Sequence, residues 1–579
     1  MNTGVDAAID IAAAGRCCRA IARAIWSGQF CVTLAGRHGA GDSAGQATER
    51  ESDMRNSHLR IAQYGVTTGA LLLGGAVLAS PVANPTEFAR IAKVDDQYQA
   101  YNVEMVEVVG GRFWAPYPKP GEAAPKPSVG PSGGVDMAAV MFRKRDPINL
   151  KTDLRLRNLA RALGPTYIRV SGGWANATYF HDSDAPPPAT PPKGYQSVLT
   201  RDQWAGVIDF VQSVGGKLVV SFPVSEGARD ASGVWNPEQA RQLNAYTRKL
   251  GGHIYAAELI NEPNVGPMVG LPKGYDAGTF AKDMAVFRAF RDAEAKDMKI
   301  VGPGSTGEAG FVIFPANAGQ ISTDALMGTE PRAKVDIFSY HFYGTVSQRC
   351  ARMDKSAGIA PDAALSEDWL GRADRYVDYY RPLQQRYAPG TDIWITETAQ
   401  AACGGDAWAA TYRDTFRYVD QLGRQARQGI SVVFHNTLAA SDYAWIDEDT
   451  MEPRPSYWAA VLWARLMGNV VLDAGQNSGK LHLYSQCLRG KPGGVAVVAI
   501  NLDTASPARF AMAGKAVRYT LTADSLDAGT VKLNGRLLTV GKDGVVPQFK
   551  GVSAQGEQSL PAASISYMAY PDAHNPACR

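Results

Sequence analysis

The 579-residue sequence lacks several features that would assign it quickly to a class of protein. Its formal net charge is only +3 and it has no long basic run, which argues against a nucleic-acid surface or a polybasic membrane anchor. It contains no paired Cys-x-x-Cys and no His-x-x-x-His motif, so we expect no catalytic metal and no cofactor. No Gly-x-Gly-x-x-Gly follows the first predicted strand, which leaves little support for dinucleotide binding.

Residues 1–79 are interpreted as an N-terminal extension that ends in a signal peptide. From Met54 onward, basic residues precede an apolar run over 66–78, and Val77-Leu78-Ala79 is a small-residue pattern suited to cleavage. Gly and Thr interrupt this run, and it falls short of the roughly 20 apolar residues that a membrane span needs. A single membrane anchor is the alternative, but we expect a secreted or periplasmic protein with no stable span after cleavage.

Cysteines are few, and removal of the leader would leave Cys350, Cys403, Cys487 and Cys578, an even number that suits an oxidising compartment. Four cysteines allow three pairings. A bridge between Cys487 and Cys578 would attach the C-terminus to its own domain, and Cys350 would then pair with Cys403 by elimination. Four buried thiols remain the alternative, because the sequence does not fix the connectivity.

The middle of the chain alternates short β-branched and aromatic runs with amphipathic segments, after a Pro-rich stretch at 116–131 that we interpret as a long loop. This alternation predicts an α/β fold, a (β/α)8 TIM barrel over residues 100–472, with an open doubly wound sheet as the rival. The eight strands are expected at 101–109, 167–170, 218–222, 254–260, 300–301, 335–341, 393–396 and 430–434. Helices are expected at 153–163, 237–250, 279–295, 369–387 and 407–428.

The residue pattern of the sequence changes beyond Asp473. Short strand-like runs at 495–500, 517–521 and 531–533 are separated by Gly, Asp, Asn and Pro and show no helical periodicity. This pattern predicts an all-β sandwich domain over 473–579, to which residues 80–99 can be joined.

Two glutamates follow predicted buried strands. Glu262 lies in Glu258-Leu-Ile-Asn-Glu-Pro-Asn264 at the end of strand four, and Glu397 lies in Trp394-Ile-Thr-Glu-Thr398 at the end of strand seven. Barrel enzymes place their working residues at the C-terminal ends of the strands, so we expect the two side chains to meet. Carboxyl groups about 5–5.5 Å apart would serve as the acid/base and the nucleophile of a retaining glycosidase. The alternative is that Asn-Glu-Pro only closes a strand.

Neighbouring residues are assigned roles around this pair. Asn261 can donate to a substrate 2-hydroxyl, and Tyr343 at the end of strand six can hydrogen-bond the nucleophile and keep it ionised. Glu258 lies inside its apolar run and is interpreted as structural. His341 is interpreted as core packing.

Several motifs, in this order, resemble the heparanase and β-glucuronidase family of clan A retaining glycosidases, glycoside hydrolase family 79. The resemblance runs from about residue 100 to the final cysteine. The motifs are 258–264 (ELINEPN), 336–343 (DIFSYHFY), 396–405 (TETAQAACGG), 443–447 (YAWID), 455–458 (PSYW) and 499–502 (AINL).

The resemblance implies a retaining double displacement on β-linked glucuronic acid, in glycans or glycoconjugates, with Glu262 as acid/base and Glu397 as nucleophile. It implies that Gly404, Gly405 and Tyr443 hold the glucuronate carboxylate, which is sensible because successive glycine N–H groups can form an anion-binding nest. A plain turn and a core tyrosine are the alternative.

The resemblance also assigns substrate-binding positions to Asn436 and Glu104, and it places the terminal cysteine in a bridge across the sandwich. Two departures limit it. Cys403 stands where vertebrate heparanases carry a tyrosine, and the segment 302–308 lacks a basic cluster, so we do not expect sulfated heparan as substrate. A clan A glycosidase acting on neutral sugars, such as a xylanase or arabinofuranosidase, and a non-catalytic carbohydrate-binding barrel are the rival interpretations.

Overall fold

The computed structural model describes part of the chain, and both the expected leader and most of the expected Pro-rich loop lie outside it. No helix among the described residues is long and apolar enough to cross a membrane. The described residues are 83–118, 141–311, 320–351, 358–475, 477 and 479–579.

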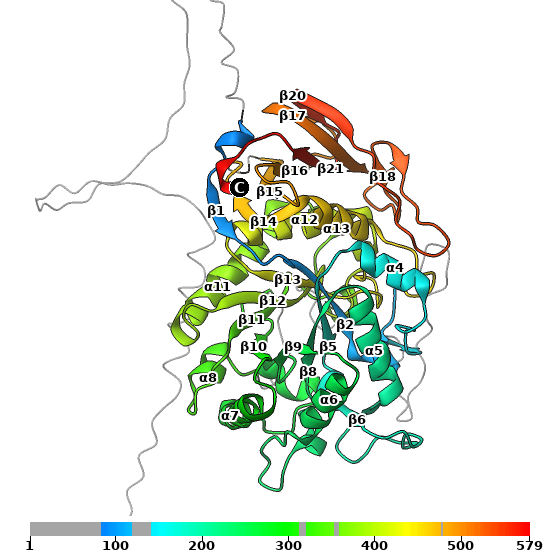
Figure 1. Ribbon diagram of the computed structural model, residues 1–579, viewed down its shortest axis with the longest axis vertical. Coiled ribbons are helices and arrows are strands. Elements are labelled where there is room, and N and C mark those ends of the chain that lie inside the picture. Colours follow the sequence, from blue (N-terminus) through cyan, green and yellow to red (C-terminus); the bar gives the residue numbers. More distant parts are fainter. Residues whose placement is uncertain (1–82, 119–140, 312–319, 352–357, 476, 478) are drawn as a thin grey trace, which may run out of the picture. The chain divides into compact units, whose positions relative to one another are not determined.

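Parallel strands close into a barrel in the centre of the described chain (Figure 1). Each strand pairs with the next one in chain order, and the ring closes where Val433 of the last strand pairs with Gln99 of the first. This is the (β/α)8 barrel that the alternation of strands and helices predicts. Its strands are β2 (Gln99–Glu104), β5 (Tyr167–Ser171), β8 (Lys217–Ser221), β9 (Ile254–Glu258), β10 (Lys299–Ser305), β11 (Ile337–Tyr343), β12 (Asp392–Ala399) and β13 (Val432–His435).

Helices cover the outside of the barrel, and the expected ones are present with small changes of boundary. Asp153 caps the helix predicted at 153–163 by accepting a hydrogen bond from the Leu156 N–H. The segment predicted at 369–387 divides into two helices, because α10 ends at Leu370 and α11 begins at Arg372. The α-helices are α2 (Met105–Val109), α4 (Leu154–Ala162), α5 (Arg201–Ser213), α6 (Glu238–Lys249), α7 (Ala277–Glu294), α8 (Thr323–Gly328), α9 (Gln348–Ala351), α10 (Glu367–Leu370), α11 (Arg372–Tyr387), α12 (Tyr412–Arg427) and α13 (Pro455–Leu466).

Short elements fill the connections between these units. The 3-10 helices are η1 (Pro85–Glu87), η2 (Ala175–Ala177), η3 (Glu226–Ala228), η4 (Pro263–Val269), η5 (Pro361–Ala363), η6 (Ala407–Ala410) and η7 (Pro576–Cys578). Two small sheets add to the loops at the C-terminal ends of the first two barrel strands. They are β3 (Gly111–Trp114) with β4 (Phe142–Arg145), and β6 (Thr178–His181) with β7 (Ser197–Thr200).

The first barrel strand is shorter than predicted. The sequence pattern extends a strand over 101–109, but β2 ends at Glu104 and the β-branched residues that follow form α2. The Glu107 carboxylate accepts a hydrogen bond of 2.7 Å from the Glu104 N–H at the start of this helix. The prediction of strand here is wrong because end capping and burial outweigh β-propensity.

A second, antiparallel sheet lies beyond the barrel strands. In the described part of the chain its order is β1-β14-β15-β16-β21-β17-β18-β19, and β20 pairs with β17. The sheet includes β1, which precedes the barrel in the sequence. After the barrel, its strands begin at Met467, ahead of the expected boundary at 473. Its strands are β1 (Arg90–Lys93), β14 (Met467–Leu472), β15 (Leu481–Leu488), β16 (Val495–Asn501), β17 (Ala508–Thr522), β18 (Lys532–Leu533), β19 (Arg536–Leu537), β20 (Val552–Leu560) and β21 (Ser564–Tyr570).

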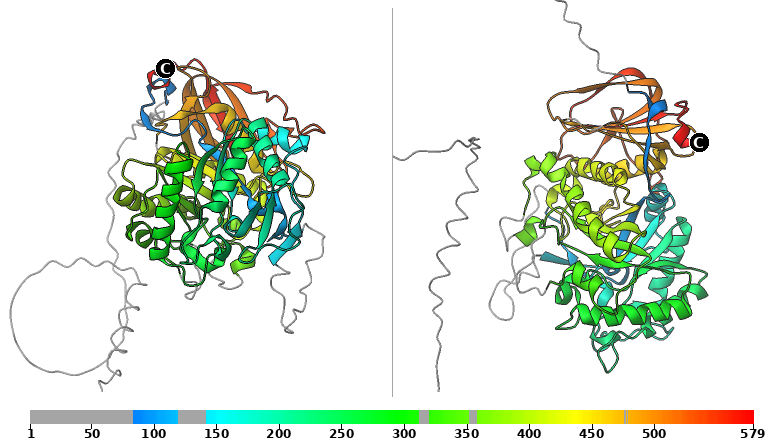
Figure 2. Two further views of the ribbon diagram at one scale, coloured as in Figure 1. Left: turned by 60° about the horizontal axis from the view of Figure 1, so that its bottom comes forward. Right: turned by 90° about the vertical axis from the view of Figure 1, so that its left-hand side faces the viewer.

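The strand β16 is buried on both faces: α12 and α13 lie against one face of the sheet (Figure 2), and residues of the antiparallel region cover the other. Val497 belongs to the core inside the antiparallel region, whereas Val498 belongs to the core shared with the barrel helices. Gly423 permits this contact, since a Cβ there would lie 2.2 Å from the Tyr484 ring. The sheet therefore packs against the outer helices of the barrel and shares a hydrophobic core with them.

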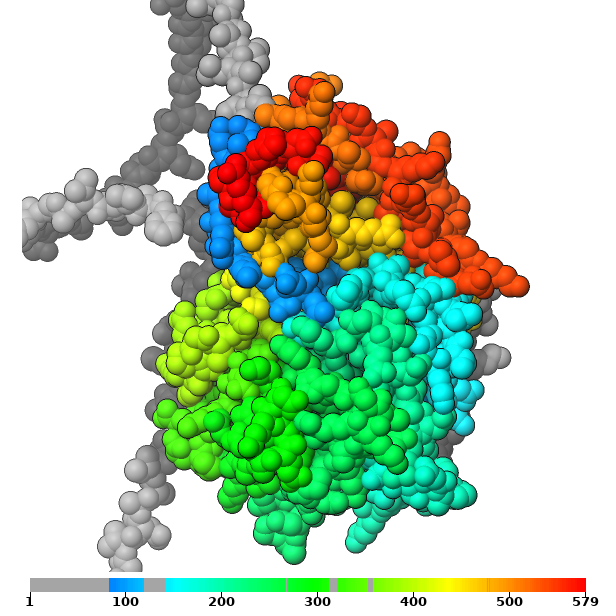
Figure 3. Space-filling model, viewed as in Figure 1, coloured from blue at the N-terminus to red at the C-terminus, as the bar shows by residue number. Residues whose placement is uncertain are grey.

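The beginning and the end of the described chain meet at this sheet (Figure 3). The Asn575 amide donates to the carbonyls of Pro85 and Phe88 at 2.7 and 2.9 Å. A disulfide joins Cys487 to Cys578, and a second joins Cys350 to Cys403. Both expected pairings are confirmed.

Candidate active site

A buried arginine stands at the centre of the site. Arg169 on β5 donates from Nε and Nη2 to Oε2 of Glu258, at 2.9 and 2.7 Å. The other oxygen of Glu258 accepts from Ser339 and Thr396 at 2.7 and 2.6 Å. Burial raises the pKa of Glu258, but Arg169, His341 and the two hydroxyls outweigh it and leave this pKa below its usual value. Glu258 is thus a fully bonded anion that anchors Arg169.

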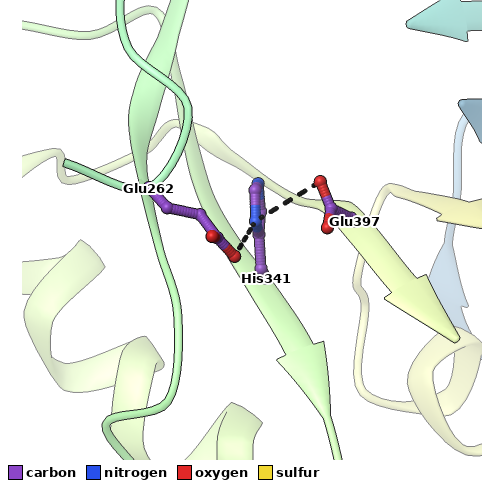
Figure 4. Close-up of side chains that lie close together, drawn as sticks. All are labelled: Glu262, His341 and Glu397. Carbon is purple, nitrogen blue, oxygen red and sulfur yellow. Dashed lines mark hydrogen bonds and ion pairs between the residues drawn. The ribbon is translucent and has the colours of Figure 1, made fainter. Parts of the chain in front are cut away.

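Glu262 lies in the loop after β9, four residues beyond the strand end. Its backbone has a φ of 53°, an uncommon left-handed conformation for a residue other than glycine. Its carboxylate is 17% exposed, and Oε1 lies 3.0 Å from Nδ1 of His341 (Figure 4). The preceding residue is fixed on both sides, because the Asn176 amide bonds the N–H and the carbonyl of Asn261. This clamp holds the Glu262 side chain at the top of the barrel.

His341 lies between the two predicted catalytic carboxylates (Figure 4). Its Nδ1 is 3.0 Å from Glu262 Oε1 and 3.7 Å from Glu397 Oε2, and its Nε2 is 3.4 Å from Nη2 of Arg169. Burial lowers the pKa of His341, but the charge of Glu397 and the bond to Glu262 raise it more, so this pKa lies above its usual value. In the neutral ring, Arg169 requires Nε2 as acceptor, which leaves the proton on Nδ1. The interpretation of His341 as core packing is therefore wrong.

Glu397 lies on β12 and is held by two donors from different strands. Tyr343 donates to Oε1 at 2.6 Å and Arg169 donates to Oε2 at 3.2 Å. Burial, followed by the charge of Glu397, raises the pKa of Tyr343 far above its usual value, so the phenol keeps its proton. Both carboxylate oxygens of Glu397 are thereby oriented.

The other predicted substrate-binding residues adjoin this pair. The Asn436 amide donates to the phenols of Tyr343 and Tyr443 at 3.1 and 3.2 Å. The Asn261 Oδ1 accepts from Arg169 at 2.8 Å, so its planar amide has its NH2 group on the opposite side. Hydrogen bonds thus link residues from strands two, four, six, seven and eight.

Glu104, at the end of β2, is buried among the same residues. Its Oε2 is buried and has no hydrogen-bond partner among the described residues. Burial and the neighbouring charge of Glu397 raise the pKa of Glu104 well above its usual value. Gly172 makes room for it, since a Cβ there would lie 1.5 Å from that oxygen. Glu104 is thus a buried carboxyl group close to the charge of Glu397.

The glycine pair differs in detail from a simple anion nest. Cys403, Gly404 and Gly405 all have positive φ, at 63°, 82° and 77°. The Gly405 N–H donates to the Ala401 carbonyl at 3.2 Å, so it is used within the turn. Tyr443 packs against Gly405, where a Cβ would lie 3.0 Å from the tyrosine Cβ. Of the two amides, that of Gly404 is the better candidate to bind an anion.

The structure brings every predicted site residue into one constellation, but sequence reasoning missed Arg169. The available signal was a charged residue inside the apolar strand Tyr167-Ile-Arg-Val-Ser171. A charge in a fully buried strand needs a partner in the interior.

Glu262, His341 and Glu397 each offer one ligand atom within 4.8 Å of the others, a spacing that could hold a metal ion. The adjacent charge of Arg169, 3.2 Å from Glu397 and 3.4 Å from His341, opposes a cation there. The expectation of no catalytic metal stays a prediction.

Comparisons with known proteins add to this geometry. No protein-family model matches the chain. Heparanase-like protein 1 of Arabidopsis thaliana is 24% identical over 367 residues, which are 61% of this chain and 64% of that protein. Baicalin-β-D-glucuronidase of Scutellaria baicalensis is 31% identical over 191 residues, 31% of this chain and 36% of that protein. The crystal structure of a 4-O-α-L-rhamnosyl-β-D-glucuronidase from Fusarium oxysporum shares the fold, with a TM-score of 0.56 at 14% identity over 85% of this chain and 99% of the other.

Fold and site together define a (β/α)8 barrel with two neighbouring glutamates among its buried polar residues and an attached antiparallel sheet. The matches span less than two thirds of the length of these two relatives. The resemblance to the heparanase and β-glucuronidase family is confirmed, because the chain is similar in sequence to a heparanase-like protein and to baicalin-β-D-glucuronidase.

Proposed function

We propose that this protein is a retaining glycoside hydrolase that cleaves β-linked glucuronic acid from glycans or glycoconjugates. The observation that carries the proposal is the approach of Glu262 and Glu397, whose ligating oxygens lie within 4.8 Å of each other. This close approach agrees with the roughly 5–5.5 Å between the carboxyl groups of retaining enzymes better than with the roughly 6.5–9.5 Å of inverting enzymes.

The reaction proceeds in two displacements. Glu397 attacks the anomeric carbon and forms a covalent ester, while Glu262 gives its proton to the departing glycosidic oxygen. Glu262 then takes a proton from water as the water oxygen attacks the same carbon, which releases the sugar and restores Glu397. Tyr343 and Arg169 hold the Glu397 oxygens in the attacking position.

Three features support glucuronate as the sugar. The relatives are named heparanase-like protein and baicalin-β-D-glucuronidase. The turn at Gly404 offers an amide for an anion, and Tyr443 packs against the next residue, Gly405. Asn436 and Glu104, whose pKa burial raises well above its usual value, supply further polar groups for the ring hydroxyls. A neutral-sugar glycosidase of the same fold is the rival, and it has no need of the anion-binding turn.

We further propose that the protein is exported and that its partner is a glucuronic-acid-containing glycan or glycoconjugate. Two disulfides support an oxidising compartment. The segment 302–308 contributes the buried strand end of β10 and the hydrogen-bonded Glu308 rather than a basic cluster, which supports unsulfated substrates.

The test is hydrolysis of aryl β-glucuronide, aryl β-glucoside and aryl β-xyloside by the purified protein, with product configuration followed by NMR. We expect preference for the glucuronide and retention of the β-configuration. Glu397→Gln and Glu262→Gln should lower kcat on the glucuronide by about a thousandfold or more. A preference for xyloside, an inverted product or an active Glu397→Gln variant would disprove the proposal.

Chemical rescue separates the two roles. Azide added to Glu262→Ala should restore turnover of a substrate with a good leaving group and give a β-glycosyl azide, because the glycosyl-enzyme still forms on Glu397. Azide added to Glu397→Ala should give the α-azide by direct displacement. The opposite pattern would exchange the two assignments.

A further inference from the structure

We propose that Arg349 is a specificity-determining positioning residue, which orients and polarises the Cys403–Gly404 peptide so that its N–H binds the carboxylate of an acidic sugar. The inference rests on the proposed glucuronidase function and deepens it. It concerns selection of the substrate and not cleavage of the bond. No resemblance or sequence motif points to Arg349.

Two side chains donate hydrogen bonds to the carbonyl of the Cys403–Gly404 peptide. Arg349 Nη1 donates to the Cys403 carbonyl at 2.9 Å, and the Ser347 hydroxyl donates to the same oxygen at 3.0 Å. A peptide unit is planar, and in the trans form its N–H points opposite to its C=O. The Gly404 N–H therefore points away from Arg349 and Ser347. A charge-assisted bond to the carbonyl also strengthens that N–H as a donor.

The arginine itself is rigidly fixed. Its Nη2 donates to Asp442 at 2.7 Å, and its guanidinium lies 4.2 Å from the centre of the Tyr117 ring. The Arg349 N–H donates to the Tyr117 hydroxyl at 3.1 Å, and the Tyr117 N–H donates to Asp442 at 3.2 Å. Arg349 is 7% exposed, so little solvent competes for its charge.

The glycine completes the arrangement. A Cβ on Gly404 would lie 2.2 Å from Arg349 Nη1 and 2.5 Å from Ser441 Oγ, so a side chain would displace the arginine. The Cys350–Cys403 disulfide ties the residue after Arg349 to the residue before Gly404. Arginine, serine, glycine and disulfide thus all fix the same peptide unit.

Asp442 neutralises part of the positive charge of Arg349, to an extent that depends on pH. Burial raises the pKa of Asp442 to about 6, although Arg349 and Arg454 oppose the rise and the Tyr117 N–H also bonds the carboxylate. Below pH 6 Asp442 gains a proton and compensates Arg349 less, whereas a sugar carboxylate, with a pKa of about 3.5, stays ionised. Affinity for an acidic sugar is therefore expected to increase as the pH falls through 6.

The experiment compares wild type with Arg349→Gln and Arg349→Lys. For Arg349→Gln we expect KM for aryl β-glucuronide, and Ki for free D-glucuronate, to rise about 10-fold to 100-fold, with kcat within a few fold of wild type. KM for aryl β-glucoside and Ki for D-glucose should not change. Arg349→Lys keeps the charge and should lie between the two. The matched control is Arg375→Gln, on the exposed surface of α11, which should match wild type throughout.

A second readout does not require turnover. D-glucuronate should raise the thermal unfolding temperature of wild type more than that of Arg349→Gln, and the gain should be larger at pH 5 than at pH 7. Asp442→Asn should remove this pH dependence. Should Arg349→Gln fail to fold, Arg349→Lys and Ser347→Ala are measured in its place, with a smaller effect in the same direction.

The outcomes separate the two proposals. If Arg349→Gln weakens the glucoside and the glucuronide equally, or leaves the Ki of glucuronate unchanged, the inference about Arg349 is overturned although the glucuronidase function stands. If wild type cleaves no glucuronide while glucuronate still binds in an Arg349-dependent manner, the proposed function fails and the anion site stands.

Discussion

Tyr343 and Glu397 are joined by a hydrogen bond of 2.6 Å between the phenol and Oε1 of the carboxylate. The two residues lie on adjacent strands, β11 and β12, where Glu397 pairs with His341, two positions before Tyr343, and both are buried. Burial raises the pKa of Tyr343 far above its usual value, so the phenol donates at every physiological pH. The nucleophile is thus oriented before any substrate arrives.

Tyr343→Phe tests this relationship. A hydrogen bond to a charged group contributes about 1.5–3 kcal/mol, so we expect kcat/KM on an aryl β-glucuronide to fall about 10-fold to 100-fold. The unfolding temperature should change little, because the ring stays in place. Tyr340→Phe, on the same strand but facing Tyr380, is the matched control and should retain full activity. Equal activity of the Tyr343→Phe variant and wild type would refute the positioning role.

Arg169 and Glu258 are expected to be coupled in stability. Arg169→Met leaves a buried carboxylate without its counter-charge and should lower the free energy of unfolding by about 3–5 kcal/mol. The double variant Arg169→Met/Glu258→Gln should be more stable than the sum of the single variants predicts. Urea unfolding of the four proteins measures the coupling. Additive losses would show that the pair does not act as a unit.

His435 predicts a loss of stability in mild acid. Burial holds the pKa of His435 well below its usual value, its Nε2 donates to the Tyr443 carbonyl at 2.9 Å, and its ring stacks on Trp445. At this histidine, the unfolded chain binds more protons than the folded one as the pH falls below about 6.5. The contribution of neutral His435 to the free energy of unfolding is thus fully present above pH 6.5. It falls as the pH decreases, by up to about 1.4 kcal/mol per pH unit.

The measurement is urea unfolding of wild type and His435→Gln between pH 7.5 and pH 5. Glu107 and Asp442, with pKa values raised to about 7 and about 6, contribute slopes of the opposite sign in both proteins. The difference between the two proteins is therefore the quantity to compare. A difference that does not change with pH would contradict a buried neutral His435.

The two disulfides are expected to differ in their effect on activity. They separate residues by 53 and 91 positions, and chain entropy assigns each a stabilisation of about 4–5 kcal/mol. Cys487→Ala/Cys578→Ala should lower the unfolding temperature and leave KM for glucuronide unchanged. Cys350→Ala/Cys403→Ala should lower the unfolding temperature and also raise that KM, because its loop carries Gly404. Equal KM values for the two variants would contradict this difference.

The barrel and the two glutamates follow from the sequence alone. β-branched runs that end in polar residues report the strand ends, and a parallel barrel necessarily brings those ends together at one rim. That constraint is enough to place Glu262 and Glu397 near each other, and it carries Tyr343 and Asn436 with them.

The surroundings of the pair, in contrast, depend on how the chain folds in three dimensions. Arg169, His341 and Arg349 owe their roles to partners between 54 and 228 positions away along the chain, and no local pattern encodes such distances. The helix after Glu104 also departs from its β-branched sequence, since a local capping pair, Glu104 and Glu107, combines with burial that depends on the tertiary structure. Local propensity determines where most helices and strands form. Which charged side chains meet in the barrel interior is determined by the way the strands and helices pack in three dimensions.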